Sequence, residues 1–129
     1  MEELFNFFIV LVVFLVLDLP MITFINKEMY KNLFDNINNG SYVDTSNMII
    51  GAIVAYLLLA YGLYTFAIKN KSIFNGALFG LVVYGVYNFT NLAVIAKYGL
   101  MQSVIDTTWG TILCSMITYI VLVYLNYTV

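Results

Sequence analysis

Four long apolar runs constrain this chain more than any other feature. They cover residues 4–25, 48–68, 73–95 and 104–125, and each is about 20 residues long. A helix of that length rises about 30 Å, which is the thickness of the hydrocarbon core of a bilayer. The runs lack the period-two alternation of barrel strands, and they are too long to be such strands. We therefore predict an all-α, membrane-embedded bundle of four transmembrane helices, forming a single domain over residues 1–129.

The composition supports this multi-pass membrane prediction. Hydrophobic residues make up 63% of the chain and charged residues 9%, whereas soluble domains have about 45–50% and about 25%. The mean hydropathy is +0.94. Such a chain has too little polar surface to cover a water-soluble globule, so we expect the lipid bilayer to be its surroundings.

Charge and residue types exclude several classes of function. The net charge is −2 and the five basic residues are scattered, so we expect no binding to nucleic acid. The chain has one cysteine and no histidine, and it shows no nucleophile motif. We therefore expect no metal site, no cofactor and no catalytic residues, although a membrane enzyme that uses two carboxylates as acid and base stays open as a minor alternative.

The connections predict how the helices are joined. Residues 26–47 hold much of the charge. Within them, apolar side chains recur at three- and four-residue spacing, which predicts a short interfacial amphipathic helix; they are Met29, Leu33, Phe34 and Ile37. The other connections are short, so neighbouring helices should be antiparallel and both termini should lie on one side. The lysines do not decide which side that is.

Small residues and tyrosines suggest further contacts. Gly76 and Gly80 form a GxxxG stretch, and Gly51 and Ala55 have the same spacing in the second run. Such stretches let two backbones approach closely, so we predict helix packing at Gly51, Gly76 and Gly80, with a homodimer seam as the alternative. We interpret the tyrosines near the ends of the predicted spans as anchors in the headgroup region; they are Tyr42, Tyr98, Tyr124 and Tyr127.

Polar side chains inside the apolar runs mark a candidate site. Asp18 and Asp106 would each cost about 2.5–3.5 kcal/mol if they faced lipid at the bilayer centre. Because the first and third helices end where the fourth begins, these side chains and those of the third run share one depth. We therefore predict a polar ligand-binding pocket; its residues are Asp18, Tyr87, Asn88, Thr90, Asn91, Asp106 and Trp109.

A structural alternative explains some of these side chains without a pocket. Asp106 could cap the fourth helix, because carboxylates favour helix N-termini. Asn88, Thr90 and Asn91 could join helices through hydrogen bonds. Asp18 argues against this alternative, because it lies too deep in the first helix to cap an end.

Two motifs resemble a known family. The stretch "YGVYNFTNLA" at 84–93 is followed by "DTTWG" at 106–110, and the pair is similar to the approximate "YGxYDLTNLA" and "DxxWG" of domain-of-unknown-function family 2177. The likeness includes "GALFG" at 76–80 and the aspartate Asp18. The chain departs from the pattern at Asn88, where the family has aspartate, at Phe89, where it has leucine, and near Met21, where it usually has tryptophan. The resemblance implies four spans and a bacterial or viral source, and it names no substrate.

We therefore favour a protein that binds or transports an ion, a proton or a small molecule through Asp18 and Asp106. A conducting path would require a homo-oligomer, because one four-helix chain has a narrow core. The alternative is a structural or regulatory membrane protein whose polar cluster only fixes helix packing.

Overall fold

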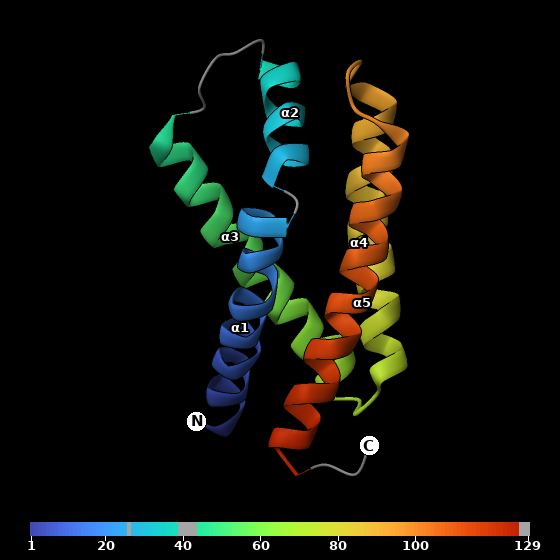
Figure 1. Cartoon of the computed structure of the whole chain (residues 1–129). Helices are drawn as coiled ribbons and strands as arrows, with labels where there is room; N and C mark the ends of the chain where they lie inside the picture. The colour runs from blue at the N-terminus through green and yellow to red at the C-terminus, as the bar shows by residue number, and fades with distance from the viewer. Residues whose placement is uncertain (26, 39–43, 127–129) are drawn as a thin grey trace.

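The computed structural model describes residues 1–25, 27–38 and 44–126, and Figure 1 shows their arrangement. The described part is built of helices, with no strand among its elements. In chain order these are α1 (Glu2–Pro20), the π-helical turn η1 (Met21–Ile25), α2 (Lys27–Asn38), α3 (Thr45–Leu63), the π-helical turn η2 (Tyr64–Ile68), α4 (Ile73–Val94) and α5 (Leu100–Tyr124).

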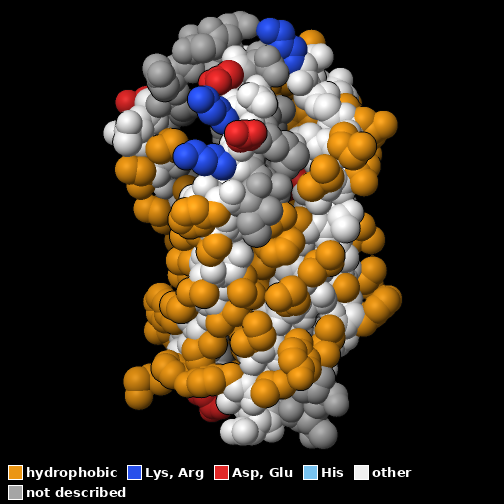
Figure 2. Space-filling view, in the orientation of Figure 1, with side chains coloured by type: hydrophobic (Ala, Val, Ile, Leu, Met, Phe, Trp, Pro, Cys, Tyr) orange, Lys and Arg blue, Asp and Glu red, His pale blue; other side chains and the backbone are white. Residues whose placement is uncertain are grey.

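Four of the helical stretches are long and apolar enough to cross a membrane, which confirms the predicted fold class. They are Glu2–Phe24, Thr45–Ile68, Ile73–Val94 and Leu100–Tyr124. The start of α1 and the end of α5 lie at the same end of the bundle (Figure 1). Apolar side chains cover most of the face in Figure 2, where lipid would surround them.

The fourth span begins earlier than the sequence predicts. We predicted a start at residue 104, whereas α5 begins at Leu100. The polar residues Gln102 and Ser103 belong to its first turn and are buried against the protein. They therefore do not face lipid, and hydropathy alone places the start too late.

A proline and a π-helical turn end the regular part of α1. Pro20 has no backbone N–H, and its ring crowds the preceding turn, so it disturbs the regular ladder of hydrogen bonds. The chain continues as η1, and the N–H of Met21 donates to the carbonyl oxygen of Asp18. The helix is thus altered directly beside the aspartate.

Helices α4 and α5 form the closest pair. A Cβ atom at Gly80 would overlap the carbonyl oxygen of Gly110, and one at Gly76 would overlap the Thr118 hydroxyl. These glycines therefore allow the two backbones to approach. The predicted packing at Gly51 is wrong, because nothing lies within 4 Å of the Cβ position of this glycine. Gly51 belongs to the first half of α3, which diverges from α4 (Figure 1).

The packed core lies in the half of the bundle that holds the termini. Val10 and Phe14 of α1 meet Leu63 of α3 and Ile117 of α5 there, and all four are fully buried. The other half contains the cavity described below.

The predicted amphipathic helix exists as α2. Its lysines Lys27 and Lys31 are exposed and Ile37 is half-buried. The side chains of Met29, Leu33 and Phe34 lie outside the described part, as do Tyr42 and Tyr127. Charged side chains gather at this end of the molecule in Figure 2. The position of α2 at the membrane interface stays a prediction.

Candidate functional site

Asp18 is buried where three helices meet. Its side chain is only 5% exposed. The Trp109 indole Nε1 donates to Asp18 Oδ1 over 2.9 Å, and the Tyr56 hydroxyl donates to Oδ2 over 2.7 Å. Both carboxyl oxygens thus accept hydrogen bonds from neutral donors, one from α5 and one from α3. The group suits a carboxylate, which has further lone pairs to offer.

A second polar cluster centres on Asn88 of α4, which is fully buried. Its amide Nδ2 donates to Asp106 Oδ2 over 2.6 Å and to the carbonyl oxygen of Tyr84 over 2.9 Å. Its Oδ1 accepts from the Tyr98 hydroxyl over 2.6 Å. The amide is therefore satisfied on both sides, and it joins α4 to α5 and to the connection between them.

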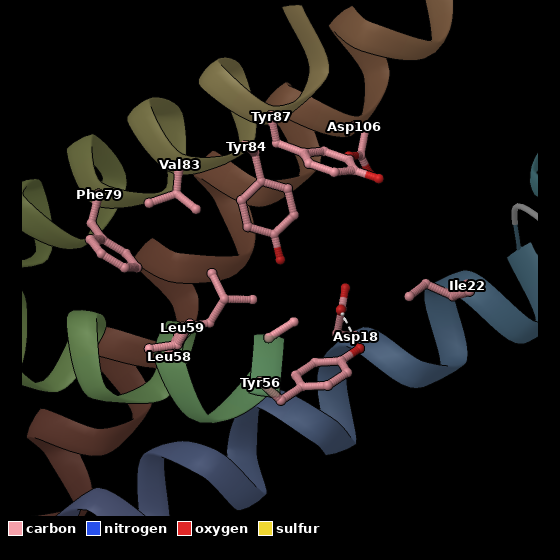
Figure 3. A pocket seen from close by; sticks show the side chains of 11 residues that line it. Asp18, Ile22, Tyr56, Leu58, Leu59, Phe79, Val83, Tyr84, Tyr87 and Asp106 are labelled. Carbon is pink, nitrogen blue, oxygen red and sulfur yellow. Dashed lines mark hydrogen bonds between the residues drawn. The ribbon is translucent and has the colours of Figure 1, made fainter. Parts of the chain in front are cut away.

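A cavity of about 570 Å³ lies between α1, α3, α4 and α5. Figure 3 shows the Asp18 carboxyl and the Tyr84 hydroxyl pointing into this space from opposite sides. Asp106 and Tyr87 line its far end, and Tyr56 lies beside Asp18. The remaining walls are hydrocarbon; they are Ile22, Ala55, Leu58, Leu59, Phe79 and Val83.

The "DTTWG" motif of α5 contributes to this site in three ways. Asp106 lines the cavity. Trp109, about one turn later, donates to Asp18. Gly110 leaves room for the ring of Tyr84, which a Cβ atom at this position would overlap. Because residues three and four apart share a helix face, all three point from α5 toward the same region of the bundle.

The structure brings most of the predicted pocket residues together. Asp18, Tyr87 and Asp106 line the cavity, while Asn88 and Trp109 hold the two carboxyl groups from behind. Two predicted residues lie apart from it.

Thr90 and Asn91 are those two. Thr90 is exposed on the outside of α4, so its predicted place in the pocket is wrong; it lies two residues from Asn88 and therefore points to another face. Asn91 is half-buried and is not among the lining residues. Burial raises the pKa of Tyr98, and a hydrogen bond to Asn91 opposes that shift.

The alternative role of Asp106 as a helix cap is also wrong. The N-cap of α5 is Gly99, so Asp106 lies well inside the helix. Its oxygen accepts from a side chain of α4 rather than from the N-terminal N–H groups of its own helix.

The sequence did not lead us to assign three tyrosines to the site. Tyr98 was predicted to be a headgroup anchor, but it is buried and its hydroxyl donates to Asn88. The backbone N–H of Tyr98 donates to the carbonyl oxygen of Ile95, and this tight turn directs the side chain inward. Tyr124 is exposed, as an anchor would be. Tyr56 and Tyr84 lie in the middle of apolar runs, and a hydroxyl at that depth was the signal that could have identified them.

Comparison with known proteins agrees with this picture. The model of the predicted membrane protein family DUF2177 matches residues 3–123, so the match includes every cavity residue. No curated protein and no solved structure matches the chain. The match covers nearly all of the chain and both motifs, and the chain therefore belongs to domain-of-unknown-function family 2177, a family of membrane proteins.

Proposed function

We propose that this protein binds a small molecule inside the bilayer, in the cavity that Asp18 and Asp106 line. The observation that carries the proposal is the cavity itself, whose volume of about 570 Å³ lies within the range of about 300–1,000 Å³ that ligand sites occupy. Its hydrocarbon walls and few convergent polar groups are also typical of such sites.

The same observations favour a small molecule over an ion. A bound Ca²⁺ takes six to eight oxygen ligands in a compact shell. Among the described residues, no group of three or more Asp, Glu, Cys or His side chains could hold a metal ion. A bare cation or a proton would also leave most of the hydrocarbon-lined space unused.

A purely structural role is the second candidate, and one observation favours it. The bonds from Tyr56 and Trp109 to Asp18 tie α1 to α3 and α5, and such bonds stabilise membrane bundles by about 0.6 kcal/mol each. This role explains the hydrogen bonds. It gives no reason for a cavity beside them.

The proposal is tested with decanol, a neutral amphiphile with a flexible chain. The measurement is the midpoint of thermal unfolding in neutral-detergent micelles at increasing decanol concentration, because a ligand of the folded state raises that midpoint. We expect decanol to protect the unchanged chain. Ala55→Phe should remove this protection, because Ala55 lines the cavity and a phenylalanine ring would fill part of it.

The matched control is Val54→Phe. Val54 is exposed on α3 and is not among the lining residues, so this variant changes the lipid-facing surface and leaves the cavity open. Equal protection of the unchanged chain and both variants would mean that decanol acts through the micelle, and it would refute a binding cavity. The structural role predicts that result.

A further inference from the structure

Building on that proposed function, we propose that the ligand is an amphiphilic amine that enters the cavity sideways from the bilayer. The protonated amine would lie between Asp18 and Asp106, and its apolar body would lie along the hydrocarbon walls. Three features lead to this class of ligand: the chemistry of the lining, the position of the opening and the arrangement of polar and apolar walls.

The few polar groups of the lining carry negative rather than positive charge. Two carboxyl groups face the cavity, and none of the described residues that line it is a lysine or an arginine. The partners of Asp18 are the neutral donors Tyr56 and Trp109. A buried carboxylate is stabilised most by a cation that also donates hydrogen bonds. An anionic headgroup at the same place would face like charges.

The cavity opens toward lipid rather than toward water. Leu58 of α3 and Tyr87 of α4 line it, and their side chains are 65% and 60% exposed. Both residues lie inside spans, which run over Thr45–Ile68 and Ile73–Val94. The opening between α3 and α4 is therefore at the depth of the acyl chains. A ligand that reaches it must first dissolve in the membrane.

The polar and apolar walls are separated, as Figure 3 shows. The Asp18 and Asp106 carboxyl groups lie on the α1 and α5 side, whereas Leu59 and Phe79 lie on the α3 and α4 side. A molecule with one cationic end and one hydrocarbon end matches this division. A compact inorganic cation matches only the polar part.

The experiment compares three probes that share one alkyl chain: decylamine, decanol and decanoate. At neutral pH the amine is cationic, the alcohol neutral and the acid anionic. Each probe is titrated against the thermal unfolding midpoint in neutral-detergent micelles, which yields an apparent affinity. Because a charged headgroup lowers partition into the micelle, each apparent affinity is corrected for the partition of that probe into protein-free micelles. The differences that remain report how the headgroup interacts with the protein.

We expect decylamine to bind about tenfold more tightly than decanol, because a charge-assisted hydrogen bond replaces a neutral one. Asp18→Asn and Asp106→Asn should each reduce the preference for decylamine over decanol, because each change removes one of the two carboxyl groups that line the cavity. If Asp18→Asn does not fold, Asp106→Asn still decides, because Asn88 can donate to the amide oxygen that this change introduces. Decanoate binding as tightly as decylamine would overturn the proposal, as would a preference for decylamine over decanol that is unchanged in Asp106→Asn.

The two proposals fail in different ways. If decanol and decylamine bind equally and Ala55→Phe abolishes both, the cavity binds small molecules but the amine class is wrong. If Ala55→Phe changes the binding of neither decanol nor decylamine, the binding cavity itself is refuted.

Discussion

The closest helix contact in the bundle makes a sharp prediction about a single methyl group. Gly80 of α4 faces Gly110 of α5, and a Cβ atom at Gly80 would overlap the carbonyl oxygen of Gly110. That oxygen belongs to the backbone, so it cannot move unless α5 moves. Gly51 of α3 offers a matched control, because nothing lies within 4 Å of its Cβ position.

The size of the effect follows from two opposing terms. Overpacking a close contact costs about 1–3 kcal/mol. Replacing a mid-helix glycine by alanine recovers up to about 1 kcal/mol of helix propensity. The second term applies to both variants, so Gly51→Ala should be neutral or slightly stabilising. We expect Gly80→Ala to be about 1–3 kcal/mol less stable than Gly51→Ala.

The assay is reversible unfolding in mixed micelles with increasing sodium dodecyl sulfate, followed by tryptophan fluorescence. The chain has one tryptophan, Trp109, and its indole bonds Asp18 across the bundle, so its emission reports whether α1 and α5 are still packed together. Equal unfolding free energies for Gly80→Ala and Gly51→Ala would refute the close α4–α5 contact. A more stable Gly80→Ala would refute it more strongly.

The second polar cluster yields two further predictions. Asn88→Asp removes the amide Nδ2 that donates to Asp106 Oδ2 and places two acidic side chains at hydrogen-bond distance, so the midpoint of thermal unfolding at neutral pH should fall by an amount equivalent to about 1–3 kcal/mol. An unchanged midpoint would contradict the contact. Tyr98→Phe removes the hydroxyl that donates to Asn88 and should lower the midpoint of thermal unfolding by an amount equivalent to about 1 kcal/mol. The matched Tyr124→Phe should have little effect, because Tyr124 is exposed, and equal effects of the two changes would show that Tyr98 is not bonded inward.

The sequence predicted the spans and the depth of the polar residues because both follow from the cost of burying polar groups in hydrocarbon. Asp18 and Asp106 could be placed near each other by counting residues from the helix ends. The rotation of each helix about its own axis was harder to predict from the sequence. Thr90 and Asn88 are two residues apart, and spacing alone did not show that only Asn88 turns inward.

Contacts that depend on tertiary packing could not be predicted from the sequence. The GxxxG stretch of α4 pairs with α5 and not with α3, because Gly110 and the small Cys114 offer it a complementary surface. Tyr56 lies in an apolar run of α3, and its bond to Asp18 depends on how α3 crosses α1. Neither fact follows from periodicity.

The cavity follows from how α3 and α4 are attached to the bundle. Gly76 and Gly80 allow α4 to pack closely against α5. The hydrogen bond from Tyr56 to Asp18 joins α3 to α1. Helices α3 and α4 meet at Gly62, where a Cβ atom would come within 2.5 Å of the Phe79 ring, so this aromatic ring occupies the place of a side chain and forms one end of the cavity.

Toward the start of α3 the two helices diverge (Figure 1), and their side chains Leu58 and Tyr87 are exposed on either side of the opening. A polar cluster that served only to fix helix packing would be most effective if α3 closed over it and excluded lipid from the hydrogen bonds. Here the cluster lies at the wall of an open, hydrocarbon-lined space. That arrangement is better suited to admitting an amphiphile than to sealing a core.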